Sequence, residues 1–272
     1  MKSRVTSHLL TKENDSIILG RGNDNGQYVN KRAINKLQQV PWTINEDILH
    51  LLSDTLKPSD TPLSAIEERD RKKSHILRDR ETNTVIDYLL ENGNKFYFGW
   101  KYDKRGRLYS QGYHINPQGN EYRKAMLSFA NKETLTSEGI QYLKIDIANT
   151  MGYDKLTWFQ RIAKANGVIA DVFNNTNPDW ESHIETLSTF ADSPLLFIKA
   201  MYAYHEGVIL GNPIGHNMGL DGTASGIQFM SALSGCVTSA QNSNVHAKIV
   251  RTYTDEAQAQ LDALEEELAQ LQ

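Results

Sequence analysis

Hydrophobic and polar residues change their spacing several times along the chain, and each spacing predicts a different element. Residues 1–40 are mostly polar, and the stretch Gly20–Gly22 within them does not match a phosphate-binding loop, which favours a turn. Apolar residues between positions 48 and 52 then predict a short helix, with Thr43 or Asn45 as its N-terminal cap.

A long helix is predicted for residues 64–92. It follows a loop that contains two helix-breaking prolines, Pro58 and Pro62, and Gly93 is a typical residue for its C-terminal end. Its sparse apolar side consists of Ile66, Ile76, Leu77, Val85, Ile86, Leu89 and Leu90. Because these few apolar residues stand among many charged ones, we expect a protruding arm rather than part of a compact core.

The pattern turns to aromatic and β-forming residues between Phe96 and Tyr113, which predicts strands. A turn is predicted at residues 116–120. Apolar spacing predicts further helices near residues 123–129, 138–151, 158–165, 193–204 and 226–233, with loop and a short strand at 209–220.

The composition is that of a soluble, folded chain, with 39% hydrophobic and 23% charged residues. No apolar run approaches the ~20 residues that a membrane span needs, and no signal peptide is recognisable at the start. The single cysteine, Cys236, excludes an internal disulfide and a thiolate zinc cage, which suits a reducing cytoplasm. A net charge of -4 argues against nucleic-acid binding by bulk charge alone.

The charge is unevenly distributed. Residues 69–124 hold thirteen Lys and Arg against seven Asp and Glu. The run from Arg69 to Arg80 is either a solvated helix face or a phosphate-contacting surface, and its residues alone favour neither. Between Lys95 and Tyr109 the cations alternate with aromatic residues, a pattern typical of a groove that binds phosphates and stacks bases.

The last nineteen residues carry six acids and no base. Their apolar residues form a heptad seam of Ala257, Leu261, Leu264, Leu268 and Leu271. The seam is too short to be a stable isolated coil, so it must pack on this chain's own surface or on a partner, and both remain open.

The most informative segment runs from Leu220 to Gln228, where an acid precedes a glycine-rich turn into a helix. Asp221 in this setting is either a metal ligand or a helix cap. A second metal-site hypothesis uses His205, Glu206 and His216, but their spacing matches no standard ligand pattern.

The residue sequence of this segment resembles motif A of the single-subunit RNA polymerases of phages and mitochondria. Other blocks resemble that family in the same order: 33–38, 42–45, 103–109, 116–124, 142–155, 161–162 and 192–194. The resemblance covers about residues 30 to 234. Phe229 departs from it, because the family usually has histidine there.

The resemblance implies an α+β fold, namely a partial right-hand polymerase fold with a helical thumb, the first half of the palm with a helical insertion, and no fingers. The implied parts are an N-terminal segment leading into the thumb (1–45), the thumb (46–95), the first part of the palm (96–130), its helical insertion (131–205), the palm with motif A (206–235) and the acidic amphipathic tail (236–272).

The resemblance also implies roles for single residues. Asp221 would bridge two Mg²⁺ ions, and the carbonyl oxygen of Gly222 would bind one of them. Lys155 would contact the nucleotide triphosphate. Residues that would position the template and the RNA–DNA hybrid are Asp103, Arg105, Arg107, Tyr109 and Lys124. For Lys124, a solvated helix lysine is an equally good interpretation.

Two parts of such a polymerase are missing from the 272 residues. No His-Asp pair supplies the second catalytic aspartate, and the fingers motif is absent. We therefore expect the chain to be inactive alone and to work with a second subunit, as in the divided RNA polymerase of enquatroviruses. DNA template, RNA product, nucleoside triphosphates and a helper protein for template loading are the other implied partners, without a membrane, in the cytoplasm of an infected bacterial host.

Two alternatives belong to other classes. A non-catalytic nucleic-acid-binding subunit would retain the palm fold without its chemistry. However, a retired site has no reason to keep Asp221, Lys155 and both arginines of the 103–109 block. A metal-dependent nuclease would need further carboxylates clustered with Asp221, and the sequence shows no such cluster.

Overall fold

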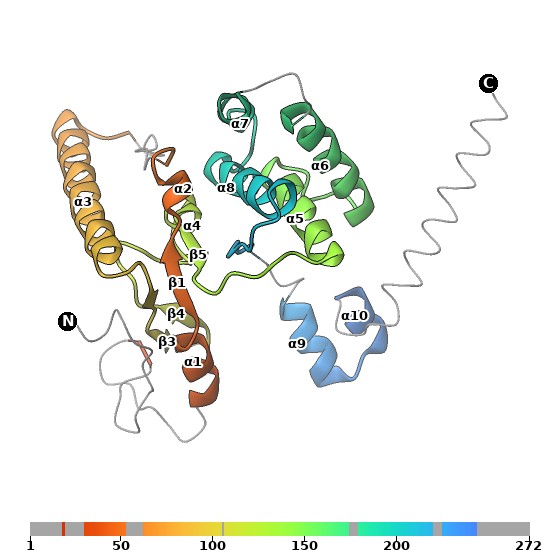
Figure 1. The fold of residues 1–272 in the computed structure, drawn as a ribbon. Coiled ribbons are helices and arrows are strands. Elements are labelled where there is room, and N and C mark those ends of the chain that lie inside the picture. The colour runs from red at the N-terminus through yellow and green to blue at the C-terminus, as the bar shows by residue number, and fades with distance from the viewer. Residues whose placement is uncertain are drawn as a thin grey trace. The chain divides into compact units, whose positions relative to one another are not determined.

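The computed structural model of the chain describes residues 18–19, 30–52, 62–104, 106–173, 179–219 and 225–243. The chain divides into two compact units, Met1–Met218 and Gly219–Gln272. The first contains a small sheet, a β-hairpin and most of the helices, and the second has two helices among its described residues (Figure 1). The predicted mixture of helices and strands is confirmed, whereas thumb and palm stay predictions.

A three-stranded antiparallel sheet joins three distant segments of the first unit. Strand β1 (Pro41–Ile44) lies between β2 (Phe96–Tyr97) and β5 (Leu127–Phe129). Trp42 is opposite both Phe96 and Phe129, and its ring centroid lies 4.8 Å from that of Phe129. The sheet is held by this aromatic core as well as by its ladder of hydrogen bonds.

Two short helices flank β1. Helix α1 (Lys31–Gln38) is capped by Asn30, whose side chain accepts a hydrogen bond of 3.1 Å from the amide of Ala33. Helix α2 (Glu46–Leu49) begins after Asn45, which was one of its two predicted caps, although the Asn45 side chain makes no capping hydrogen bond. Thr43 lies inside β1, so it is not the cap.

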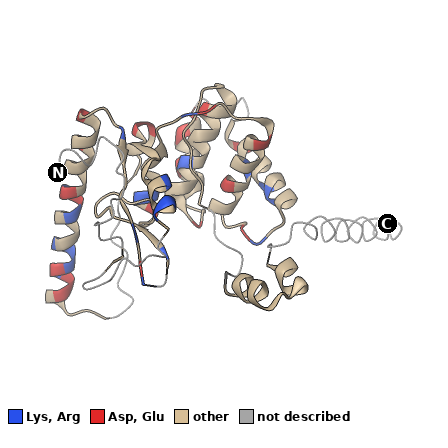
Figure 2. Cartoon of the chain, turned by 90° about the horizontal axis from the view of Figure 1, so that it is seen from below, with Lys and Arg blue, Asp and Glu red and all other residues tan. Residues whose placement is uncertain are grey.

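The predicted long helix is confirmed as α3 (Ala65–Glu91). A capping box starts it, because Ser64 accepts from the Glu67 amide while the Glu67 carboxylate accepts from the Ser64 amide. Charges of both signs run along the helix (Figure 2).

Only part of the predicted apolar side of α3 is a core face. Ile86 and Leu89 are buried against the aromatic core of the sheet. Ile66, Ile76 and Leu77, nearer the start of the helix, are mostly exposed. The expectation of an arm is thus met by the first half of α3 and not by its end.

The segment predicted as a helix near residues 123–129 is a helix only in its first part. Helix α4 (Glu121–Ala125) is capped by Asn120 and gives way to β5 at Leu127. The prediction of helix up to Phe129 is wrong because β1 offers an edge to which residues 127–129 bind as a strand.

The second half of the first unit is a group of packed helices: α5 (Ser137–Thr150), α6 (Trp158–Phe173), α7 (Trp180–Ser188) and α8 (Pro194–Tyr204), followed by a π-helical turn, η2 (His205–Ile209). Their shared core includes Ile147, Ile184 and Phe197, all fully buried. Helices α5 and α8 match their predictions, α6 continues eight residues beyond its predicted end, and α7 was not predicted.

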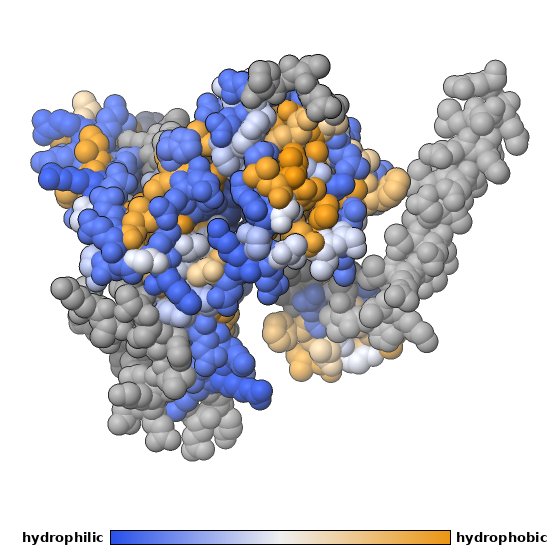
Figure 3. All heavy atoms as spheres, in the orientation of Figure 1, coloured by the Kyte–Doolittle hydropathy of each residue, from blue (hydrophilic) through white to orange (hydrophobic). Residues whose placement is uncertain are grey.

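The second unit contains α9 (Ser225–Ser234), which confirms a predicted helix, and α10 (Val237–Asn242). Residues 225–243 include no charged residue. Apolar side chains reach the surface around α9 (Figure 3), among them Ile227, Phe229, Met230 and Leu233. Residues 244–272, which hold the acidic residues and the heptad seam of the predicted tail, lie outside the described residues. No helix in the described part of the chain is long and apolar enough to cross a membrane.

Candidate functional site

Five of the eight predicted site residues are described: Asp103, Arg107, Tyr109, Lys124 and Lys155. Arg105, Asp221 and Gly222 lie outside the described residues. All five described residues belong to the first unit.

Asp103 shapes the turn of a β-hairpin. The hairpin consists of β3 (Trp100–Tyr102) and β4 (Leu108–Ser110), in which Lys101 lies opposite Tyr109. The Asp103 carboxylate accepts a hydrogen bond of 2.9 Å from the amide of Arg107, and Gly106 adopts a φ of +82°. Asp103 therefore has a structural role in presenting Arg107, a role that the resemblance did not suggest.

Gln118 joins the predicted turn at residues 116–120 to the hairpin. Its side-chain oxygen accepts from the Ser110 amide at 2.8 Å, and its side-chain nitrogen donates to the Leu108 carbonyl at 2.9 Å. One amide side chain thus satisfies both ends of β4. Two of the motifs singled out in the sequence, 103–109 and 116–124, are consequently neighbours in space.

Lys155 lies on the loop between α5 and α6 with its side chain 88% exposed, and its ammonium pairs with the neighbouring Asp154. The pKa of Asp154 is lowered, chiefly by the hydrogen bond from Lys155. The ammonium of Lys155 thus faces solvent, where a phosphate could replace Asp154 as its partner.

Arg161, on α6, holds this loop in shape. Its guanidinium donates to the carbonyl oxygen of Leu156 at 2.8 Å, to the side-chain oxygen of Asn149 at 3.0 Å and to the carbonyl oxygen of Asp154. Since Asp154 and Leu156 flank Lys155, the guanidinium fixes the backbone on both sides of that residue.

Gly152 allows a close approach between the loop and the segment before α8. It has a φ of +95°, and a Cβ there would lie 2.6 Å from a carboxylate oxygen of Asp192. The amide of Ser193 donates to the Thr150 carbonyl at 3.0 Å. The 142–155 and 192–194 motifs therefore also meet.

Glu121 caps the start of α8, a contact that the sequence did not reveal. Its carboxylate accepts hydrogen bonds from the amides of Leu195 at 2.6 Å and Leu196 at 3.2 Å. A carboxylate in this place satisfies free amides and complements the helix dipole. It links α4, which carries the exposed Lys124, to α8.

The segment that leads towards Asp221 runs beside β5. The amide of Phe129 donates to the carbonyl of Gly215 at 2.7 Å, and Ile214 forms an antiparallel bridge with Glu133. A Cβ on Gly215 would lie 2.0 Å from the carbonyl oxygen of Phe129. This contact is therefore open only to glycine.

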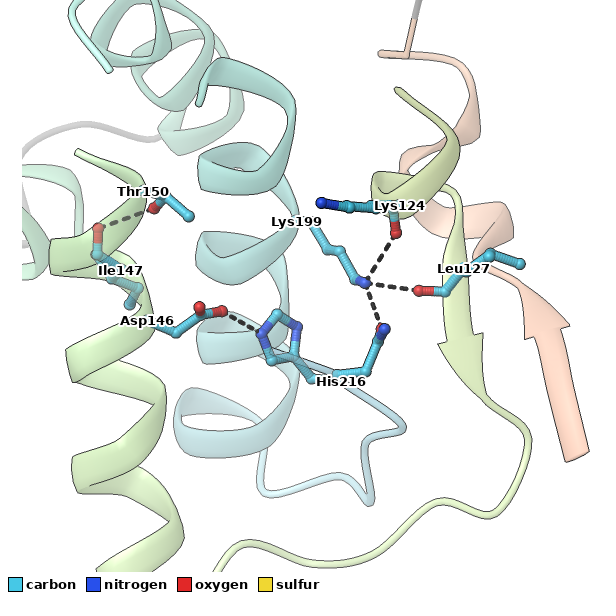
Figure 4. A network of polar contacts seen from close by, with 8 residues as sticks. Lys124, Leu127, Asp146, Ile147, Thr150, Lys199 and His216 are labelled. Carbon is cyan, nitrogen blue, oxygen red and sulfur yellow. Dashed lines mark hydrogen bonds and ion pairs between the residues drawn. The ribbon is translucent and has the colours of Figure 1, made fainter. Parts of the chain in front are cut away.

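Lys199, in the middle of α8, is a buried cation with 2% exposure. Its ammonium donates to the carbonyl oxygens of Leu127 at 2.6 Å and Lys124 at 3.3 Å, and to the side-chain oxygen of Asn217 (Figure 4). Burial lowers the pKa of Lys199 to about 7, and Asp146 opposes that shift in part. The sequence signal that could have indicated it is a lone lysine within the apolar run of α8.

Asp146 and His216 form a second buried pair. The Asp146 carboxylate, on α5, lies 2.7 Å from Nε2 of His216 (Figure 4). Burial lowers the pKa of His216, although its hydrogen bond to Asp146 acts in the opposite direction. His216 is therefore held against α5 by this hydrogen bond.

The alternative metal site of His205, Glu206 and His216 is not formed. His205 stacks on the ring of Trp180, at 4.3 Å between centroids, while His216 binds Asp146. Among the described residues, no three side chains of His, Cys, Asp or Glu gather so that they could hold a metal ion.

Two clefts border the segment that precedes Asp221. One is lined by residues of β1, α2 and η2, the other by residues of α1, α5 and the 131–136 loop. Ile214, Gly215 and His216 line both. Residues 214–216 thus lie between two clefts of the first unit.

Comparison with known proteins agrees with the resemblance. The model of the family described as DNA-dependent RNA polymerase matches residues 133–261. The relatives are DNA-directed RNA polymerases of the phage and mitochondrial type. The chain is therefore similar to the kind of protein that the ordered sequence motifs resemble.

Individual relatives show how far the similarity extends. The chain is 28% identical over 239 residues to the T7 RNA polymerase of Escherichia phage T7, which covers 74% of this chain and 26% of that protein. It is 25% identical over 262 residues to the mitochondrial DNA-directed RNA polymerase of Schizosaccharomyces pombe, covering 84% of this chain and 22% of that protein. The chain spans about a quarter of the length of these relatives.

Proposed function

We propose that the chain is part of a phage-type DNA-directed RNA polymerase and supplies motif A of its nucleotidyl-transfer site. In this proposal residues 46–95 are the thumb, and 96–130 and 206–235 belong to the palm, with residues 131–205 as a helical insertion. The observation that carries it is the attachment of residues 214–217, just before Asp221, to both β5 and α8. A metal ligand requires such a fixed approach.

The reaction joins the 3'-hydroxyl of the RNA to the α-phosphate of an incoming nucleoside triphosphate and releases pyrophosphate. The carboxylate of Asp221 and the carbonyl oxygen of Gly222 are the hard oxygen donors that suit Mg²⁺. Two bound Mg²⁺ ions would stabilise the attacking and leaving oxygens. Lys155 would contact the triphosphate and offset the charge that moves to pyrophosphate.

Nucleic acid would be held mainly by the hairpin. Arg105 and Arg107 would contact phosphates of the template or hybrid, and Asp103 would fix the turn that presents Arg107. Tyr109, opposite Lys101 in the hairpin, would contact the same nucleic acid. Lys124, exposed on α4, would add a backbone contact.

The second catalytic carboxylate must come from outside the 272 residues, because they contain no His-Asp pair. We infer that a separate subunit supplies it together with the fingers, and that a helper protein or single-stranded DNA provides the template. The work would take place in the cytoplasm of an infected bacterial host.

The test is to purify the chain from its natural source with its bound partner and to measure RNA extension. Asp221→Asn should abolish extension while assembly and template binding remain. Asp87→Asn, an exposed carboxylate on α3, is the matched control and should leave extension unchanged. If Asp221→Asn extends RNA normally while loss of the chain weakens template binding, the chain is a non-catalytic nucleic-acid-binding subunit. A fully active isolated chain would exclude the second subunit.

A further inference from the structure

We propose that Lys199 and Asp146 are positioning residues which hold the segment leading into Asp221 in its working place. This inference rests on the proposed function of Asp221. Both side chains are too deeply buried to touch a nucleotide, since Lys199 is 2% and Asp146 8% exposed. Both would act through the backbone of residues 216 and 217.

Lys199 ties three elements together at one nitrogen atom. It binds the end of α4 through the Lys124 carbonyl and β5 through the Leu127 carbonyl. It also binds Asn217, in residues 214–217, which we call the approach segment. An ammonium has three donors, and all three have an acceptor here. Through this one nitrogen atom, Asn217 is joined to both α8 and β5.

Burial of such a cation is costly. A buried ammonium loses its hydration and is tolerated only when its hydrogen bonds are satisfied. An apolar residue at this position would avoid the cost of burying a charge, but it would leave the carbonyl oxygens of Lys124 and Leu127 without this donor. What an apolar residue would lack is the ability to fix Asn217 at a set distance from β5.

Asp146 provides the second attachment from the opposite direction. It holds His216 from α5, whereas Lys199 holds the adjacent Asn217 from α8. Adjacent residues of the segment are thus held from two different helices, so the two contacts together restrain both its position and its rotation. With Gly215 pinned against Phe129, three consecutive residues are held.

The distance to Asp221 along the chain is short. Asn217 precedes Asp221 by four residues, which span at most roughly 14 Å when fully extended. A shift of about 1 Å in a catalytic group can cost on the order of a hundredfold in rate. Release of residues 216 and 217 should therefore lower turnover.

The experiment compares Lys199→Met and Asn217→Ala with Lys144→Met, a partly exposed lysine of α5, in the full chain bound to its partner. Hydrogen exchange reports on the segment without any need for activity. We expect the amides of Phe129 and Ile214 to exchange at least about tenfold faster in both test variants and at the wild-type rate in the control. Asn217→Ala retains both carbonyl partners of Lys199 and covers the case in which Lys199→Met does not fold.

The kinetic part separates positioning from general stability. In the test variants kcat for RNA extension should fall on the order of a hundredfold, with the nucleotide KM and template affinity nearly unchanged. Unchanged exchange at Phe129 and Ile214, or faster exchange with normal kcat, would overturn the inference. Failure of the proposed function would be seen separately, as normal extension by Asp221→Asn.

Discussion

Arg161 donates a hydrogen bond of 3.0 Å to the side-chain oxygen of Asn149, and so connects the first turns of α6 to the end of α5. The same guanidinium binds the carbonyl oxygens on either side of Lys155. The loop that carries the proposed triphosphate-binding lysine is therefore set before any nucleotide arrives. Preorganisation of this kind reduces the entropy lost on binding.

Substitution of Arg161 by Lys should disturb this loop. A lysine cannot reproduce the forked set of donors, so at most one of the three hydrogen bonds remains. We expect the nucleotide KM in the extension assay to rise about tenfold, which corresponds to ~1.4 kcal/mol, with template affinity unchanged. An unaltered KM would show that the loop keeps its shape without the guanidinium.

Lys155 itself can be tested without risk to the fold, since its side chain is 88% exposed. Lys155→Ala should leave the melting temperature unchanged and raise the nucleotide KM about tenfold, whereas Lys155→Arg should restore much of the affinity. Lys144→Ala removes the same charge elsewhere and serves as the control. Equal effects of the two alanine variants would exclude a specific triphosphate contact.

Two glycines should respond oppositely to alanine. Gly215→Ala would press a methyl group against the Phe129 carbonyl and should destabilise the fold by at least about 2 kcal/mol. Gly167→Ala, in α6 with open space around it, should stabilise the fold by about 0.5–1 kcal/mol. Urea unfolding of the two variants measures both values. A neutral Gly215→Ala would mean that residues 214–217 can leave β5 at little cost.

The pH dependence of stability should report the buried Lys199. Its folded-state pKa is lowered to about 7 from 10.5, so between these values the unfolded chain binds more protons and stability rises with pH. At about 1.4 kcal/mol per pKa unit, the rise is on the order of a few kcal/mol. The lowered pKa of His216 should add a further rise of stability with pH below pH 6.5, because the unfolded chain holds that proton to a higher pH than the folded one.

Urea unfolding between pH 6 and 10, compared with Lys199→Met, isolates the lysine contribution. The variant should lose most of the increase above pH 7, because it has no group to titrate there. Parallel curves for the two proteins would show that Lys199 stays protonated in the fold throughout this range.

Two exposed lysines of α3 give a test of the proposed thumb. Lys72 and Lys73 are exposed, and their replacement by Ala should shorten transcripts. It should also lower the slope of log K for template binding against log salt concentration, by the equivalent of up to about two phosphate contacts. Asp70→Ala, on the same helix, is the control of opposite charge. Unchanged transcript length and salt slope would favour the solvated helix face.

The sequence predicted elements whose signals are local. The proline-containing loop before it, the length of its polar pattern and Gly93 after it were sufficient for α3, and the apolar spacing of α5 and α8 was sufficient for their bounds. Strands β1 and β5 were missed because each has only three or four residues and forms by pairing with a segment about eighty positions away.

The site was predicted unevenly. The motifs named Asp103 and Lys155, but they did not reveal that Gln118 and Arg161 shape the surroundings of these residues through hydrogen bonds to nearby backbone. The sequence did not indicate a function for Lys199, because its contacts with Leu127 and Asn217 form only when the fold brings these residues together.

The three-way contact of Lys199 also bears on the order in which the chain folds. Its partners Leu127 and Lys124 are 72 and 75 positions away, so the contact closes a long loop and should form late. The approach to Asp221 would then become ordered only after the sheet and α8 have assembled. A partly folded chain would in that case lack an organised metal-binding segment, which would keep incomplete molecules from capturing substrate.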